Sequence, residues 1–147
     1  MKALLAALIF ACFVPGLAST AGLDTFAWKN RVLLVVAEAG NSMLAQQRQV
    51  IAAQQAALAE RDMVVLQVSG DTVTPLYGNA PGVTAGELLN AAKIDPSSSG
   101  FQAVLIGKDG GVKLRQDRPI TAEALFGLID AMPMRAGEQR GSKSSRP

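Results

Sequence analysis

The sequence predicts an α/β domain in which a central mixed sheet is flanked by helices. Three observations support this prediction: an aliphatic run at residues 32–37, a helical segment that separates it from a second run at 63–68, and an Asp-Gly turn between two later strand-like segments. Strands that are buried on both faces have continuous apolar sequences, which favours a sheet covered by helices. The length of 147 residues fits one globular domain with its ends.

Residues 1–21 predict a secretory signal peptide. A positive start at Met1-Lys2 precedes an apolar segment over 3–17, and small residues follow, which permits cleavage after Ala18 or Ala21. The apolar segment is shorter than the roughly 20 residues of a membrane-spanning helix. We therefore expect a periplasmic or secreted protein with no stable membrane insertion after the signal is removed.

The first half of the domain predicts a parallel βαβ unit. The aliphatic strand at 32–37 is followed by a break at Gly40-Asn41-Ser42, which supplies helix-capping oxygens. Residues 43–60 are rich in Ala, Gln and Leu and predict a helix with one apolar face. A second strand at 63–68 completes the unit, because a helix between two buried strands is typical of parallel pairing.

A loop and a short helix are predicted next. Residues 69–82 contain repeated Gly and Pro, which predicts a loop. Thr84 and Glu87 have the spacing of a capping box, so we expect a helix that runs to about Lys93. Asp95-Pro96 ends it, since proline disfavours helical geometry in the residue before it.

The last part of the domain predicts an antiparallel hairpin and a final helix. Strands at 101–106 and 112–115 flank the turn at 107–111, whose Asp-Gly pair suits a tight hairpin. Thr121 is placed to cap a helix that Pro133 ends.

The predicted order of βαβ, a connecting helix and ββα is the thioredoxin-like arrangement. The hairpin argues against a doubly wound fold, in which the strands stay parallel. We assign residues 22–136 to the domain and residues 137–147 to a disordered basic tail. No nucleic-acid partner is expected, because phosphate binding needs several cations on one ordered face.

Five segments also suggest a family. They are Trp28-Lys29-Asn30-Arg31, Gln47-Arg48, Arg61-Asp62, Gly107-Lys108-Asp109-Gly110 with Lys113, and Ile129-Asp130-Ala131-Met132-Pro133-Met134-Arg135. Together they closely resemble the bacterial domain-of-unknown-function family also called P-DUDES, over about residues 23–138. The resemblance implies a thioredoxin-like fold related to peroxiredoxins, with relatives repeated in a secreted vertebrate matrix protein. It implies no established activity.

Composition excludes several kinds of catalysis. Cys12, the single cysteine, lies in the predicted signal peptide, and the chain has no histidine. Thioredoxins and peroxiredoxins carry the reactive cysteine where the first strand meets the first helix, and residues 38–42 contain none. Lipidation at Cys12 is disfavoured by the bulky Phe10. Without histidine, zinc would need carboxylates alone, so we predict no catalytic residue, metal or cofactor.

Two regions are candidates for binding. Backbone N–H groups at 41–44 start a helix and are able to receive an anion, with Arg48 further along and Glu38 opposing unless the two form a structural ion pair. The second region is Arg135 after the Met-Pro-Met segment at 132–134, whose methionines either pack in the core or form an adaptable surface. The candidate binding residues are Glu38, Asn41, Ser42, Arg48, Lys108 and Arg135.

These observations predict an exported thioredoxin-like domain without redox cysteines that binds a protein or a small anion and is not an enzyme. One alternative is a non-thiol enzyme that uses a carboxylate and an arginine at the old active-site edge. Such an enzyme requires a carboxylate in a pocket with a strongly perturbed pKa. The other alternative is a structural protein of the cell envelope or matrix.

Overall fold

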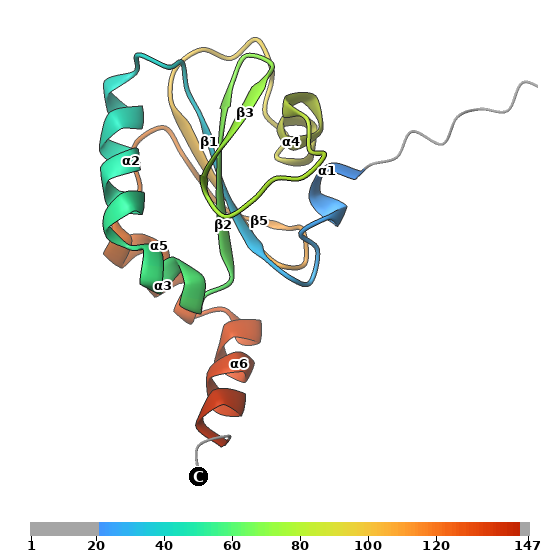
Figure 1. Cartoon of the computed structure of the whole chain (residues 1–147), viewed down its shortest axis with the longest axis vertical. Coiled ribbons are helices and arrows are strands. Elements are labelled where there is room, and N and C mark those ends of the chain that lie inside the picture. The colour runs from blue at the N-terminus through green and yellow to red at the C-terminus, as the bar shows by residue number, and fades with distance from the viewer. Residues whose placement is uncertain (1–20, 145–147) are drawn as a thin grey trace, which may run out of the picture.

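The structure, a computed structural model, describes residues 21–144, and its sheet has five strands in the order β3-β2-β1-β4-β5 (Figure 1). The elements are α1 (Ala21–Asp24), β1 (Arg31–Val36), α2 (Ser42–Ala53), α3 (Gln55–Glu60), β2 (Met63–Ser69), β3 (Thr72–Tyr77), α4 (Ala85–Ala91), β4 (Gln102–Ile106), β5 (Val112–Gln116), α5 (Ala122–Asp130) and α6 (Pro133–Ser144). The central strand β1 pairs parallel with β2 and antiparallel with β4. The predicted α/β fold with a mixed sheet is confirmed.

Helices cover both faces of the sheet. Helices α2, α3 and α5 lie on one side, and α1 and α4 lie on the other (Figure 1). Because successive side chains of a strand point to opposite faces, β1 contributes Leu33 and Val35 to the first core and Val32 and Leu34 to the second. This alternation explains why the sequence of β1 is apolar at consecutive positions.

The long helix predicted over residues 43–60 is divided in two. Helix α2 ends at Ala53, and Gln54 leaves helical geometry with φ −123° and ψ 21° before α3 begins. Leu58 in α3 is fully buried in the same core as Leu44 and Ile51 of α2. Composition indicates helix on both sides of Gln54 and carries no signal for the break.

The prediction of a loop over residues 69–82 is wrong for residues 72–77, which form strand β3. Strand β3 pairs antiparallel with β2 after a two-residue turn at Gly70-Asp71, in which Gly70 has φ +54°. Pro75 is tolerated because β3 is an edge strand, where a missing N–H breaks no ladder between two neighbours. The Gly and Pro content therefore marks an edge hairpin here.

The predicted caps and hairpin are present. In the capping box, Glu87 N donates to Thr84 Oγ1 at 3.3 Å and Thr84 N donates to Glu87 Oε2 at 2.9 Å. The Thr121 hydroxyl accepts from Ala124 N at 3.2 Å and caps α5. Strands β4 and β5 pair antiparallel around a turn in which Gly110 has φ +78°.

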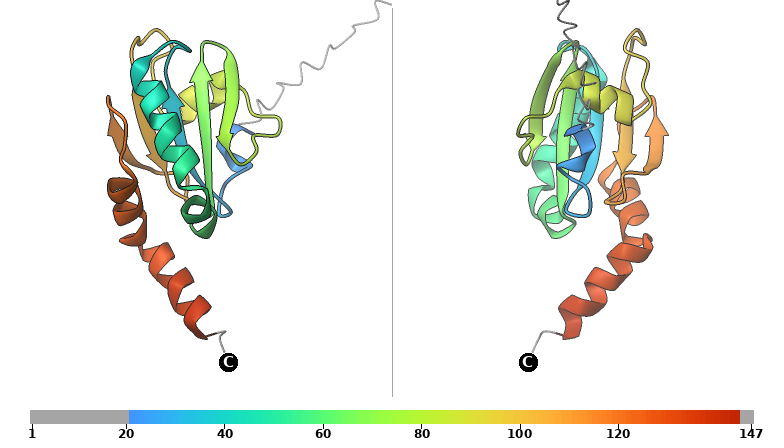
Figure 2. Two further views of the ribbon diagram at one scale, coloured as in Figure 1. Left: turned by 60° about the vertical axis from the view of Figure 1, so that its left-hand side comes forward. Right: turned by 90° about the vertical axis from the view of Figure 1, so that its right-hand side faces the viewer.

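The C-terminal segment differs from the prediction. Residues 137–144, expected to be disordered, form most of α6, and Pro133 begins this helix rather than only ending the one before it. Proline suits the first helical position because the N–H it lacks has no partner there. Helix α6 extends away from the sheet (Figure 2).

Two predicted segments fall partly outside the described residues. Residues 1–20 of the predicted signal peptide and residues 145–147 of the predicted tail are not described. Between residues 21 and 144, no helix is both long and apolar enough to cross a membrane.

Candidate functional site

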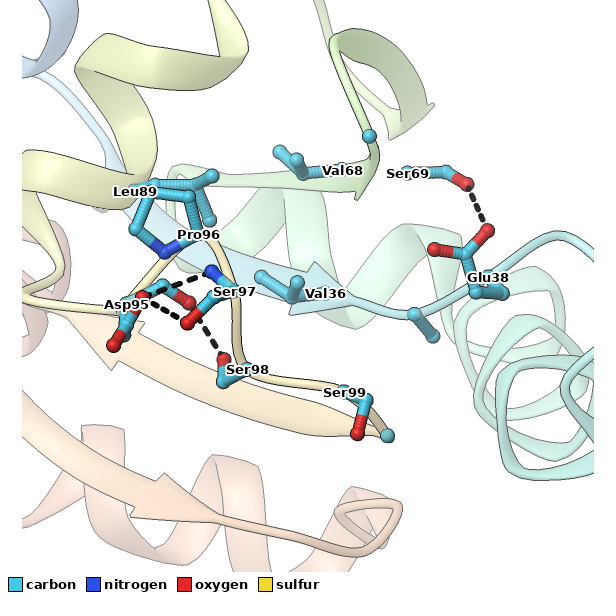
Figure 3. A pocket seen from close by; sticks show the side chains of 13 residues that line it. Val36, Glu38, Val68, Ser69, Leu89, Asp95, Pro96, Ser97, Ser98 and Ser99 are labelled. Carbon is cyan, nitrogen blue, oxygen red and sulfur yellow. Dashed lines mark hydrogen bonds between the residues drawn. The ribbon is translucent and has the colours of Figure 1, made fainter.

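The two candidate regions lie at opposite ends of β1. The first, the β1-end cleft, is lined by Val36, Ala37, Glu38, Val68, Ser69, Gly70, Leu89 and residues 95–100. It has a volume of about 220 Å³ and lies at the end of the strand that faces the start of α2 (Figure 3). This is the strand-to-helix junction at which the sequence predicted a binding edge.

Glu38 reaches this cleft but is held only loosely. Its side chain is exposed, and Ser69 Oγ donates to Glu38 Oε2 at 3.5 Å (Figure 3). No ion pair joins Glu38 to Arg48 in the part of the chain that the structure describes. Arg48 Nη2 instead donates to Gln67 Oε1 at 2.5 Å, so the predicted structural ion pair is not formed.

The other carboxylate of the cleft, Asp95, has a structural role. Its Oδ1 accepts from Ser97 N at 2.8 Å and from Ser97 Oγ at 2.7 Å. These hydrogen bonds from Ser97 lower the pKa of Asp95 below its usual value. A general acid or base works best with a pKa near the operating pH, and the pKa of Asp95 is shifted away from neutral pH.

The predicted anion site at the start of α2 is largely occupied by the chain itself. Asn41 Oδ1 accepts from Met43 N at 2.9 Å and from Leu44 N at 3.4 Å. Asn41 N donates to Glu38 O at 3.0 Å, and Ser42 is exposed. Because three of the four N–H groups already have partners, Asn41 acts as a helix cap and this terminus is poorly placed to receive an anion.

A much denser set of charges lies at the other end of β1. We call it the basal ion network; its members are Arg31, Arg61, Lys108, Arg135, Glu60, Asp62, Asp130 and Glu138. The network brings together Lys108 and Arg135, two of the predicted binding residues. The other four, Glu38, Asn41, Ser42 and Arg48, do not belong to it.

Glu138 of α6 is the centre of this network. Its Oε1 lies 2.6 Å from Lys108 Nζ, and its two oxygens lie 3.4 Å from the Arg31 guanidinium nitrogens. Arg135 Nη1 is 3.4 Å from Oε2. Burial by itself raises the pKa of Glu138, but the bonds to Lys108 and Arg31 outweigh it and the pKa is lowered. Glu138 therefore remains a carboxylate.

Lys108 is held between two carboxylates. Its Nζ lies 2.8 Å from Asp62 Oδ2 as well as 2.6 Å from Glu138. Burial lowers the pKa of Lys108, and the hydrogen bonds to Asp62 and Glu138 more than compensate, so the pKa is raised. Lys108 stays charged at neutral pH.

Asp130 joins α5 to the network. Arg61 donates two hydrogen bonds to its carboxylate, from Nη2 to Oδ2 at 2.8 Å and from Nε to Oδ1 at 3.0 Å. The Arg61 guanidinium also lies 4.5 Å from the centre of the Phe126 ring. Arg135 Nε is 3.4 Å from Asp130 and Arg135 Nη2 is 3.2 Å from Glu60. The Arg61 hydrogen bonds lower the pKa of Asp130, so Asp130 is a carboxylate near neutral pH.

Next to the network lies the turn pocket, with a volume of about 380 Å³. The pocket is lined by charged residues that include Arg31, Lys108 and Lys113, and by apolar residues that include Leu128, Met132 and Met134. A Cβ at Gly107 would lie 2.6 Å from Lys113 Cε, so a larger residue there would displace the end of the lysine side chain. Lys113 pairs with Asp109 at 2.8 Å on the rim.

Exposed apolar side chains gather around the same turn. Trp28, Val112 and Met134 are the exposed large hydrophobics among the described residues, at 69%, 39% and 40% exposure. Trp28 N donates to Lys108 O at 2.7 Å, Val112 begins β5, and Met134 lines the turn pocket. Trp28 also has φ +62°, a conformation that non-glycine residues rarely adopt. Met134 thus supports the surface interpretation of the Met-Pro-Met segment, whereas Met132 packs against the core.

Sequence reasoning missed Arg31, Lys113 and Glu138 as site residues. Arg31 directly precedes the aliphatic strand, and a charge at the start of a central strand is a signal for a buried cation that needs a partner. Glu138 was missed because its segment was expected to be disordered. Pro133, which lies four residues before that segment and begins α6, was the available signal for a helix.

The fold and these sites define a thioredoxin-like α/β domain with no cysteine in its described part. The chain belongs to the family described as a domain of unknown function, DUF4174, whose model matches residues 22–138. This agrees with the expected thioredoxin-like domain of unknown function, and the name P-DUDES stays a prediction. Within residues 21–144, no group of acidic side chains is placed to hold a metal ion.

Solved structures support the fold alone. The chain is similar to the reduced 2-Cys peroxiredoxin of Plasmodium vivax, with a TM-score of 0.55 and 22% identity over 81% of this chain and 72% of that chain. Thioredoxin peroxidase I of Plasmodium yoelii matches with a TM-score of 0.44 and 19% identity over 85% and 82% of the two chains, too low a score to support an argument. No curated protein matches the sequence.

Proposed function

We propose that this protein is an exported binding module that performs no thiol chemistry and takes a small anion with an apolar part in the turn pocket. The observation that carries the proposal is the composition of that pocket. Arg31, Lys108 and Lys113 line it together with the apolar side chains of Leu128, Met132 and Met134. The carboxylate of Asp109 also lines the pocket and is paired with Lys113. Cations hydrogen-bond carboxylates strongly, and the apolar lining suits a hydrocarbon part.

The size and accessibility of the pocket fit this function. Its volume of about 380 Å³ falls in the range of roughly 300–1,000 Å³ that is typical of small-molecule sites. Lys113 is partly exposed and lies on the rim, and Met134 is 40% exposed. An incoming ligand therefore has access to both a cation and an apolar contact.

A protein partner is the second candidate. Trp28, Val112 and Met134 are exposed around the same turn, and tryptophan is enriched among the residues that dominate binding energy in protein interfaces. The enzyme alternative has less support, because Asp95 in the β1-end cleft has a lowered pKa. The structural-protein alternative rests on the family resemblance alone.

The site is tested by titrating octanoate into the purified protein while the fluorescence of Trp28, its single tryptophan, is recorded. Lys113→Gln removes a rim cation from the pocket, and Lys29→Gln removes the same charge from an exposed lysine that does not line it. We expect saturable binding that Lys113→Gln weakens and Lys29→Gln leaves unchanged. Absence of binding by the wild-type protein, or equal effects of the two variants, would contradict the proposed site.

Export is tested by intact mass spectrometry of the protein purified from cells that express the full chain. The proposal predicts a polypeptide that begins at Ser19 or Gly22, according to cleavage after Ala18 or Ala21. Recovery of a chain that retains Cys12, for example as a lipid-modified N-terminus, would contradict both export by cleavage and the absence of a thiol.

A further inference from the structure

We propose that Glu138 is an internal ligand of the turn pocket, and that an aliphatic carboxylate binds there by replacing Glu138 and releasing the end of helix α6. This inference rests on the proposed function, because it concerns ligand class and regulation at the same site. It assigns α6 a role that neither the fold nor the family gives it.

The side chain of Glu138 already occupies the position that the carboxylate of a ligand would need. It lies 2.6 Å from Lys108 Nζ and 3.4 Å from two nitrogens of Arg31, and both of these cations line the turn pocket. The Glu138 side chain is 28% exposed, whereas those of Lys108 and Arg31 are 8% and 1% exposed. The two cations are thus buried in the domain, and Glu138 is the group of the three that solvent reaches most easily.

Arg31 retains unused binding capacity. Its Nε is buried and has no hydrogen-bond partner among the residues that the structure describes. Its contacts with Glu138 are both 3.4 Å long, while a good charged N–H to oxygen bond is about 2.7–2.9 Å. A carboxylate that is not tethered to α6 is free to approach Arg31 at the shorter distance.

Helix α6 is poorly stabilised beyond its first turn. Gly137 and Gly141 lie inside it, and glycine in a helix interior is destabilising relative to alanine. Residues 139–141 are exposed, and a polar 12-residue helix is marginal by itself in water. The helical structure of α6 therefore depends on its charged contacts to the rest of the domain. Glu138 makes two of these contacts, one to Arg31 at the start of β1 and one to Lys108 in the turn after β4.

The release has a defined starting point. Arg135, in the first turn of α6, is bound to Glu60 and Asp130 as well as to Glu138. Loss of the Glu138 contacts to Lys108 and Arg31 leaves those other contacts in place. The segment that becomes free therefore begins after Arg135 and includes the exposed Arg140.

The apolar lining selects among carboxylates. Leu128, Met132 and Met134 line the pocket beside the cations, and burial of each methylene group against such a surface favours binding. Octanoate is therefore expected to bind more tightly than acetate. Octanamide has the same chain without the charge and is expected to bind more weakly than octanoate.

The test compares Glu138→Gln with Glu123→Gln, which removes the same charge from an exposed glutamate of α5 that is outside the network. If Glu138 competes with the ligand, Glu138→Gln binds octanoate at least about fivefold more tightly than wild type, and Glu123→Gln binds as wild type does. Octanoate also accelerates tryptic cleavage after Arg140 in the wild-type protein. In Glu138→Gln that cleavage is already fast without octanoate.

The outcomes separate the two proposals. Equal or weaker octanoate binding by Glu138→Gln overturns the internal-ligand inference and leaves the binding function in place. The same conclusion follows if octanoate binds to the wild-type protein without changing cleavage after Arg140. If neither wild type nor Glu138→Gln binds octanoate, the proposed function fails and the inference fails with it.

Discussion

The two ends of β1 differ in how their polar groups are held. At the β1-end cleft the contacts are local or exposed: Asp95 bonds to Ser97, two residues away, and Glu38 reaches only Ser69 at 3.5 Å. At the other end, Arg31 and Glu138 meet although 107 positions separate them in sequence. The end at which this fold usually carries a reactive cysteine thus has few constraints, and the opposite end concentrates the buried charge.

The largest expected effect is the loss of Arg31. Its side chain is 1% exposed, and its removal leaves Lys108 and Glu138 in a partly buried network without their third partner. Breaking a buried ion pair from one side costs about 3–5 kcal/mol. We expect Arg31→Ala to lower the free energy of unfolding in urea by about 3 kcal/mol. If Arg31→Ala lowers the free energy of unfolding no more than Arg48→Ala does at the other end of β1, the proposed difference between the two ends is contradicted.

Acid should remove the stability that the basal carboxylates Asp130 and Glu138 contribute. The pKa values of Asp130 and Glu138 are lowered in the folded protein, so their contribution to stability is present above the unfolded values of about 3.9 and 4.3. It is lost as the pH falls through the lower folded values. Urea unfolding between pH 7 and pH 2 should show this loss, and Asp130→Asn should flatten the curve. An unchanged curve for Asp130→Asn would contradict the role given to this carboxylate.

Arg48→Ala is expected to have a smaller effect on stability and none on ligand binding. The exposed Arg48 is the hydrogen-bond donor to Gln67 Oε1, and Gln67 is 3% exposed. Leaving a buried acceptor without its partner costs about 1–3 kcal/mol, and water at the surface reduces that cost, so we expect about 1 kcal/mol. Weaker octanoate binding in this variant would place the ligand at the wrong end of β1.

The smallest effect is predicted for Glu38→Gln. Glu38 is exposed and forms one long hydrogen bond with Ser69. Surface substitutions of this kind usually change stability by less than about 0.5 kcal/mol. Thermal unfolding and octanoate titration should both match the wild type, and a large change in either would restore the β1-end cleft as a functional candidate.

Local sequence signals predicted most of the core elements. The apolar strands, the Thr84–Glu87 capping box and the Asp-Gly hairpin each depend on residues within a few positions of one another. Strand β3 was missed because Pro75 argues against a strand until its position at the sheet edge is known. Helix α6 was missed because polar, glycine-containing sequences such as 137–144 have weak intrinsic helix propensity.

The candidate site was only partly predictable for a related reason. Lys108 and Arg135 were identified as cations, but their shared partner Glu138 becomes visible only when α6 is placed against β1. Asn41 was identified correctly as a polar group at a helix start, and its side chain then proved to occupy that terminus itself. Four of the five segments that carry the family resemblance meet at the basal end, and the fifth, Gln47-Arg48, does not.

The most direct test of the account is to map amide chemical-shift changes by NMR while octanoate is added to the isotopically labelled, exported protein. We expect changes at residues 107–113 and 128–138, which surround the turn pocket and the base of α6. Changes confined to residues 36–42 and 95–100, with the turn pocket unaffected, would contradict it and return the binding site to the β1-end cleft.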